Sequence, residues 1–155
     1  MNLILWRHAE AEYGPSDLAR QLTEKGRRQA STVAAWLRGH LPPDTRVLAS
    51  EAARSRQTAA YLVQDYAVLP ALNPDIRAQT LPRLLESFDS KANLVIVGHQ
   101  PWLGELSAFL LNGDWDGDAY WSYKKGGFWW FQVKRGSDGF HVKLKAALTP
   151  EILLD

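Results

Sequence analysis

Short apolar runs alternate along the chain with segments whose apolar residues recur every three or four positions. Continuous apolar runs of four to six residues are typical of strands that are buried on both faces, as in a parallel sheet. Apolar residues at three- and four-residue spacing instead indicate a helix with one face on the core. The runs that predict strands are residues 2–6, 46–49 and 93–98, and the periodic segments that predict helices lie between Thr23 and Gly39, between Ser50 and Asp65, and between Pro101 and Asn112.

The ends of these predicted helices carry residues that commonly start or stop a helix. Thr23 and Ser50 suit the N-cap position, because a side-chain oxygen there can accept a hydrogen bond from a free N–H of the first turn. Pro101 suits the first turn of the third helix. Gly39 and the pair Asn112-Gly113 are stop signals.

The remaining segments are less regular. Residues 68–82 contain three prolines and predict a short strand and a loop, followed by a short helix near residues 84–88. Residues 128–133 and 140–144 predict two antiparallel strands joined by a turn at 137–139. Alternating strands and helices predict an α/β fold: a single domain over residues 1–155, built as a three-layer α/β/α sandwich with a mainly parallel sheet and a C-terminal antiparallel strand pair.

The composition excludes several kinds of chemistry. The 155-residue chain has no cysteine, so it cannot form disulfides or thiolate metal sites, and it cannot use a cysteine nucleophile. Its formal net charge is +1, far below the basic excess expected of a nucleic-acid-binding protein. No apolar run is long enough for a membrane span or an export signal. We therefore expect a cytoplasmic protein, a monomer, that binds neither nucleic acid nor membrane.

Chargeable residues follow three of the predicted strands. Arg7-His8 follow the first strand, the helix bearing Arg54 follows the second, and His99 follows the third. The carboxyl ends of parallel strands meet at one edge of the sheet, so these two histidines and two arginines should converge there. Arginine forks match phosphate oxygens, a neutral imidazole can attack phosphorus, and a protonated imidazole can stabilise the developing charge. The pattern predicts a phosphoryl-transfer pocket that needs neither a metal nor another cofactor.

Four segments carry a resemblance to a known family. They are residues 5–11 (Leu-Trp-Arg-His-Ala-Glu-Ala), residues 17–26 (Asp-Leu-Ala-Arg-Gln-Leu-Thr-Glu-Lys-Gly), residues 50–58 (Ser-Glu-Ala-Ala-Arg-Ser-Arg-Gln-Thr) and residues 97–101 (Val-Gly-His-Gln-Pro). In this order they resemble the motifs of the histidine phosphatase superfamily, which also contains the phosphoglycerate mutases. The resemblance is closest to the small SixA-type phosphohistidine phosphatases, and it spans residues 3 to 104.

The resemblance implies a role for each matched residue. His8 would be the nucleophile that becomes phosphorylated, and Arg7, Arg54 and His99 would complete the phosphate pocket. Arg20, in the second motif, would bind substrate at the rim of that pocket.

The chain departs from the family motifs at three positions, and the resemblance implies one further residue at the rim of the pocket. Asp17 would lie at the rim beside Arg20. Gln21 and Glu51 stand where the motifs have proline, which changes loop geometry but removes no charged pocket group. Ala9 replaces the superfamily's glycine, a change that resembles the SixA-type subgroup.

A general acid is missing from these motifs. Mutases and many sugar-phosphate phosphatases of the superfamily place a glutamate in a long insertion between the second and third motifs, whereas residues 61–98 form a short connection here. Glu86 is the candidate in that segment. An alkoxide leaving group needs a proton donor, whereas an imidazole leaving from phosphohistidine is a much weaker base and can be protonated beforehand. The absence of an acid favours phosphohistidine, on a protein or as a small phosphoramidate; the alternatives are a phosphatase for small phosphate esters and a non-catalytic phosphate-binding module.

Other polar and aromatic residues have simpler interpretations. His40, in a proline-rich turn, is expected on the surface, and His141, in a terminal strand, is expected to be structural or exposed. The pair Lys124-Lys125 is expected in a solvated loop, with a docking site as the alternative. Trp102 and Trp121 are candidates for lining the site.

Overall fold

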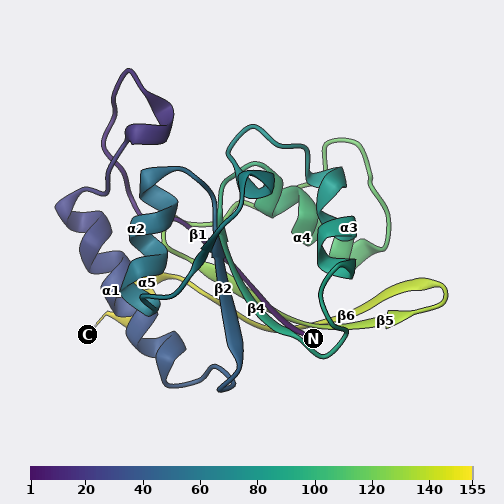
Figure 1. Ribbon diagram of the computed structural model, residues 1–155. Helices are drawn as coiled ribbons and strands as arrows, with labels where there is room; N and C mark the ends of the chain where they lie inside the picture. The colour runs from purple at the N-terminus through teal and green to yellow at the C-terminus, as the bar shows by residue number, and fades with distance from the viewer. Residues whose placement is uncertain (155) are drawn as a thin grey trace.

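The computed structural model describes residues 1–154, in which the strands form one sheet with helices on both faces (Figure 1). The strand order is β3-β2-β4-β1-β5-β6. Strands β3, β2, β4 and β1 run parallel, whereas β5 is antiparallel to β1 and β6 is antiparallel to β5. The strands are β1 (Asn2–Arg7), β2 (Thr45–Ala49), β3 (Ala67–Val68), β4 (Asn93–Gly98), β5 (Phe128–Gly136) and β6 (Gly139–Leu148).

The side chains of β1 alternate between two cores, one on each face of the sheet. Leu3 and Leu5 pack in one core with residues of α3 and α4, and Ile4 and Trp6 pack in the other with residues of α1 and α2. Figure 1 shows α1, α2 and α5 together on one side of the sheet and α3 and α4 on the other. The helices are α1 (Glu24–Arg38), α2 (Ala53–Leu62), α3 (Leu81–Glu86), α4 (Trp102–Asn112) and α5 (Pro150–Leu153), with short 3₁₀ turns η1 (Asp17–Ala19), η2 (Pro70–Leu72) and η3 (Ala78–Thr80).

The predicted fold class is confirmed. A continuous apolar run becomes a strand buried on both faces because a parallel sheet covered on both sides leaves neither face to solvent. Thr23 caps α1 as predicted, since its hydroxyl accepts a hydrogen bond from the Gly26 N–H at 2.9 Å. Gly113 ends α4 in the left-handed region, at φ +85°, where glycine carries no steric cost.

The prediction that Ser50 caps the second helix is wrong. Helix α2 begins at Ala53 after a capping residue, Ala52, whose side chain accepts no hydrogen bond. Ser50 lies two residues before the cap, and its hydroxyl accepts from the N–H of Ala52 itself at 3.2 Å. The helix also ends at Leu62, before the predicted end near Asp65, because the chain becomes extended at the next residue.

Candidate active site

The strand register brings the predicted residues to one edge of the sheet. Arg7 pairs with Gly98 across β1 and β4, and Ala49 pairs with Val97 across β2 and β4. The residues that directly follow β1, β2 and β4 therefore lie at the same edge of the sheet. His8 donates its backbone N–H to the carbonyl of Gly98 at 3.1 Å. The rings of His8 and His99 lie 5.1 Å apart between centroids.

One nitrogen of the His8 ring is committed to the backbone. Its Nδ1 lies 2.7 Å from the carbonyl oxygen of Ala9. A carbonyl oxygen only accepts, so Nδ1 carries the hydrogen and Nε2 of the neutral ring keeps its lone pair. Burial, together with the positive charges of Arg54, Arg7 and Arg20, lowers the pKa of His8 to about 3. His8 is therefore a neutral imidazole at neutral pH with Nε2 available as a nucleophile.

The second histidine is held by a serine. The Nε2 atom of His99 lies 2.7 Å from the Ser50 hydroxyl, which also accepts the N–H of Ala52. The Nδ1 atom of His99 is buried and has no hydrogen-bond partner within residues 1–154. Burial, with the neighbouring His8 and Arg54, lowers the pKa of His99 to about 2. His99 is thus neutral in the free pocket, and the protonated form expected from the sequence requires an anion beside it.

The arginines are fixed by different partners. Arg54, 4% exposed, donates from one terminal nitrogen to the Asp17 carbonyl at 2.6 Å and from the other to the Asp17 carboxylate at 3.1 Å. Arg20 donates to the second oxygen of that carboxylate at 3.2 Å and to the Glu12 carbonyl at 2.6 Å. Arg7 donates to the Tyr123 carbonyl at 2.6 Å. The Nε atoms of Arg7 and Arg54 are buried without partners among the described residues, so both guanidinium groups retain donors for a ligand.

These side chains surround a cavity of about 220 Å³. Within the described chain, its lining includes four permanently cationic side chains and no carboxylate. The two histidines of the lining are neutral and add ring nitrogens that can contact a bound anion. An arrangement of this kind favours a multiply charged anion such as a phosphate dianion. The lining residues are Arg7, His8, Ala11, Tyr13, Arg20, Arg54, Pro74, His99, Gln100 and Lys125.

Comparison with known proteins places this chain in a family. The model of the histidine phosphatase superfamily (branch 1) matches residues 3–86. The chain belongs to the histidine phosphatase superfamily. A relative in Haemophilus influenzae, a phosphohistidine phosphatase SixA homolog, is 30% identical over 126 residues, which cover 71% of this chain and 77% of the relative.

Solved structures share the fold of this superfamily member. The protein histidine phosphatase SixA, complexed with tungstate, superposes with a TM-score of 0.81 at 23% identity, over 99% of this chain and 100% of that one. A phosphoserine phosphatase mutant from Entamoeba histolytica, in complex with phosphoserine, superposes with a TM-score of 0.72 at 18% identity and covers 99% of each chain. At these identities the likeness describes the fold.

Several residues of the pocket were not predicted. Lys125, expected in a solvated loop, is exposed but lines the pocket, as do Tyr13, Pro74 and Gln100. Lys125 reaches the pocket because β5, which begins three residues later, pairs with β1. Ser50, which the sequence predicts as a helix cap, holds His99 instead. The polar loop at Lys124-Lys125 is visible in the sequence, but the antiparallel pairing of β5 with β1 that places it is not.

Glu86 lies far from the pocket. It is at the end of α3, where its carbonyl accepts a hydrogen bond from Arg135 at 2.9 Å. Arg135 lies in β5 beyond Gln132, which pairs with Asn2 at the opposite end of β1 from His8. The structure therefore does not bring Glu86, the candidate general acid, to the histidines.

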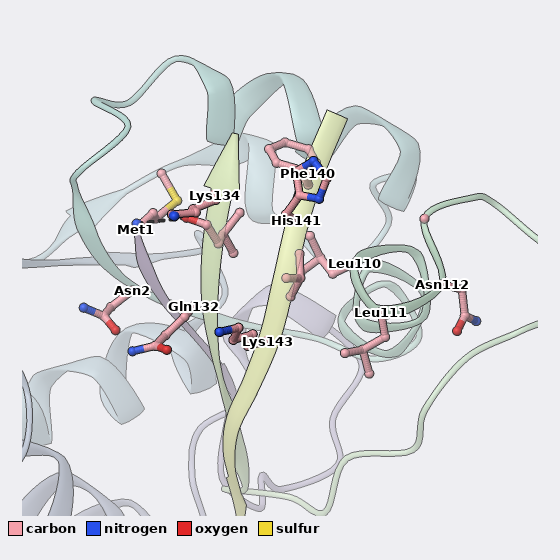
Figure 2. A pocket seen from close by; sticks show the side chains of 13 residues that line it. Met1, Asn2, Leu110, Leu111, Asn112, Gln132, Lys134, Phe140, His141 and Lys143 are labelled. Atoms are coloured by element: carbon pink, nitrogen blue, oxygen red, sulfur yellow. Dashed lines mark hydrogen bonds between the residues drawn. The ribbon is translucent and has the colours of Figure 1, made fainter. Parts of the chain in front are cut away.

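A larger cavity, of about 620 Å³, also lies at that opposite end (Figure 2). Met1, at the start of the chain, lines it together with Leu110, Lys134, Phe140 and His141. None of the residues predicted to bind phosphate is among its lining side chains within residues 1–154. Size alone therefore does not identify the site.

The remaining candidates are placed as follows. Trp102 is fully buried beside His99, with its indole N–H donated to the Asn73 carbonyl at 3.1 Å. Trp121 is half-exposed and is absent from the lining of the pocket among the described residues. His40 and His141 are exposed, as predicted.

Within residues 1–154, no helix is both long and apolar enough to cross a membrane. In the same part of the chain, no cluster of three or more His, Asp or Glu side chains could hold a metal ion.

Proposed function

We propose that this chain is a phosphatase that hydrolyses phosphohistidine, on a protein or as a small phosphoramidate, through a phosphohistidine intermediate on His8. The similarity to SixA proteins supports the substrate class. The observation that carries the proposal is a cationic pocket around a neutral histidine with, among its described lining residues, no carboxylate.

In the first step Nε2 of His8 attacks the phosphorus atom. The P–N bond to the leaving imidazole breaks as the P–Nε2 bond forms, and the leaving nitrogen keeps the bonding electron pair. The bond from Nδ1–H to the Ala9 carbonyl orients the ring and stabilises the positive charge that develops on it. The free Nε atoms of Arg7 and Arg54 supply donors for the phosphoryl oxygens.

His99 donates a hydrogen bond to the same phosphoryl oxygens. Its Nδ1 has no protein partner within residues 1–154, so an N–H there can donate to a phosphoryl oxygen. An approaching dianion favours the charged form of the ring and raises its pKa from the low value of the free pocket. The Ser50 hydroxyl then accepts from Nε2–H and keeps the ring in place.

In the second step water hydrolyses the phosphorylated enzyme. The water oxygen forms a new bond to phosphorus, the P–Nε2 bond breaks, and His8 recovers its lone pair. Both protons of the water leave with the inorganic phosphate, which then releases one of them to solvent according to its own ionisation. The reaction proposed here uses the side chains of the pocket alone, so treatment with a chelator should leave the rate unchanged.

The leaving group determines which substrates suit this pocket. An alkoxide is a strong base that must be protonated as it leaves, and this role commonly falls to a carboxylic acid. Asp17 is the carboxylate tied to the pocket arginines, and hydrogen bonds from Arg54 and Arg20 outweigh its partial burial and lower its pKa. Asp17 is therefore ionised at neutral pH and unsuited to donate a proton. A protonated imidazole leaves without such help.

A comparison of substrates tests this proposal. The protein is assayed for phosphate release from a phosphohistidine-containing protein, free phosphohistidine and a sugar phosphate, each with and without a chelator. We expect kcat/KM to be at least about 100-fold higher for the phosphoramidates than for the sugar phosphate, the size of effect that a general acid supplies. Preference for the sugar phosphate would identify an ester phosphatase. Binding without phosphate release would identify a binding module.

A further inference from the structure

Lys125 sits on a loop that is tied to the catalytic strand. The N–H of Gly126 donates to the carbonyl of His8 at 3.1 Å, and the Gly126 carbonyl accepts from the Trp6 indole at 2.9 Å. The Arg7 N–H donates to the Gly127 carbonyl at 2.9 Å. Gly126 adopts φ +77°, a conformation that glycine adopts without strain. The backbone next to Lys125 is therefore fixed against the backbone of the nucleophile.

The ammonium group of Lys125 has no partner of its own among the described residues. It forms no ion pair within residues 1–154, unlike Arg20 and Arg54, which share the Asp17 carboxylate. Lys125 is exposed and lines the mouth of the pocket. Its neighbour Lys124 is also exposed, but it lines neither the pocket at His8 nor the larger cavity at the opposite end of β1.

The charges of the pocket exceed those of a single phosphate. Arg7, Arg20, Arg54 and Lys125 carry four positive charges, and the Asp17 carboxylate offsets one of them. Both histidines are neutral in the free pocket. A bound phosphoryl dianion leaves about one positive charge uncompensated, and about two once His99 is protonated beside it. Arg54 is buried and Arg7 is half-buried, and each keeps an unpaired Nε among the described residues for the phosphoryl group, so the excess charge falls to the exposed Lys125.

We infer that Lys125 binds a carboxylate of the substrate that lies beside the phosphoryl group, on the leaving-group side. This inference rests on the proposed function, since it requires the phosphate to occupy the pocket at His8. The ammonium of Lys125 is a single point charge, which matches a carboxylate better than a second phosphate dianion. Lys125 is then a residue that selects phosphorylated substrates bearing a neighbouring acid group.

Equilibrium binding of two phosphonates tests the inference without requiring turnover. The probes are 3-phosphonopropionate and its amide, 3-phosphonopropionamide, which have nearly the same shape and differ by one negative charge. Both are titrated calorimetrically at low ionic strength, above the second ionisation of the phosphonate, into the wild type and the variants Lys125→Met, Lys125→Arg and Lys124→Met. Low salt is needed because exposed charges are strongly screened.

We expect the wild type to bind the carboxylate about fivefold more tightly than the amide, the upper range for an exposed ion pair. Lys125→Met should remove that preference, while Lys125→Arg and Lys124→Met should keep it. Equal affinities in the wild type, or an unchanged preference in Lys125→Met, would overturn the inference and leave the phosphate pocket intact. Failure of both probes to bind would instead show that the pocket does not hold phosphate, and the proposed function would fall as well.

Discussion

Replacing Ser50 with alanine removes the hydroxyl that holds His99. Ser50 is fully buried, and its Oγ lies 2.7 Å from Nε2 of His99. His99 is neutral in the free pocket, because burial and nearby positive charge lower its pKa, and becomes charged only when phosphate is bound. The hydrogen bond to Ser50 is therefore stronger in the transition state than in the free enzyme, and its loss should lower kcat/KM.

The size of the effect follows from the change in charge. A hydrogen bond between neutral groups contributes about 1 kcal/mol, and one to a charged group about 1.5–3 kcal/mol. The difference of about 0.5–2 kcal/mol corresponds to a loss of about 2- to 30-fold in kcat/KM. Because His99 is charged once phosphate is bound, part of this loss should appear as a higher KM.

Steady-state kinetics of Ser50→Ala and of a matched control, Ser107→Ala, measure the effect. Ser107 is also fully buried, and its hydroxyl bonds to the Leu103 carbonyl at 2.8 Å and the Tyr123 hydroxyl at 2.7 Å rather than to His99. Both variants should lose about 1–3 kcal/mol of stability in urea unfolding, because each leaves buried polar groups unpaired. Only Ser50→Ala should lose kcat/KM. An unchanged kcat/KM in Ser50→Ala, or an equal loss in Ser107→Ala, would refute the reasoning.

Three other predictions follow from the same contacts. Glu86→Gln should leave kcat/KM on phosphohistidine unchanged, because Glu86 lies at the opposite end of β1 from the nucleophile; a loss above about tenfold would give it the role of a general acid. Acid should destabilise the fold, because the folded-state pKa values of His8 and His99 lie below the ordinary value of 6.5, so the unfolded chain binds more protons as pH falls below 6.5. The loss from these two groups at pH 5 is at most about 4 kcal/mol in urea unfolding, and the double variant with glutamine at both positions should lose less; equal losses would contradict the cause. Gly98→Ala should lower the urea midpoint by an amount equivalent to 1–3 kcal/mol or more, since a Cβ there would lie 2.1 Å from the buried ring of Trp102; an unchanged midpoint would contradict the packing.

The sequence predicts the part of the site that depends on parallel strands. The apolar runs ending at Arg7, Ala49 and Gly98 are short and continuous, which distinguishes buried strands from helices. Once these runs are taken as parallel strands, their carboxyl ends must share an edge. His8 and His99 therefore come together without any knowledge of the loops.

The rest of the site depends on contacts between distant segments. Asp17 joins Arg54 across 37 positions, and no local pattern encodes that pairing. Lys125 reaches the pocket through the antiparallel pairing of β5 with β1, whose register the sequence does not display. Ser50 has the chemistry of a cap, but the helix begins further along, so its hydroxyl is available to His99. Each of these three placements depends on tertiary contacts that residue types alone do not specify.

The central claim is that His8 carries the phosphoryl group between the two steps. The direct measurement is a rapid quench of the protein with a radiolabelled phosphohistidine donor, followed by mapping of label that is stable in base and labile in acid. His40→Ala is a control, because His40 is an exposed histidine outside the pocket. We expect label on the wild type and on His40→Ala at residue 8, and none on His8→Ala. Absence of label from the wild type, or undiminished label and turnover in His8→Ala, would contradict the claim.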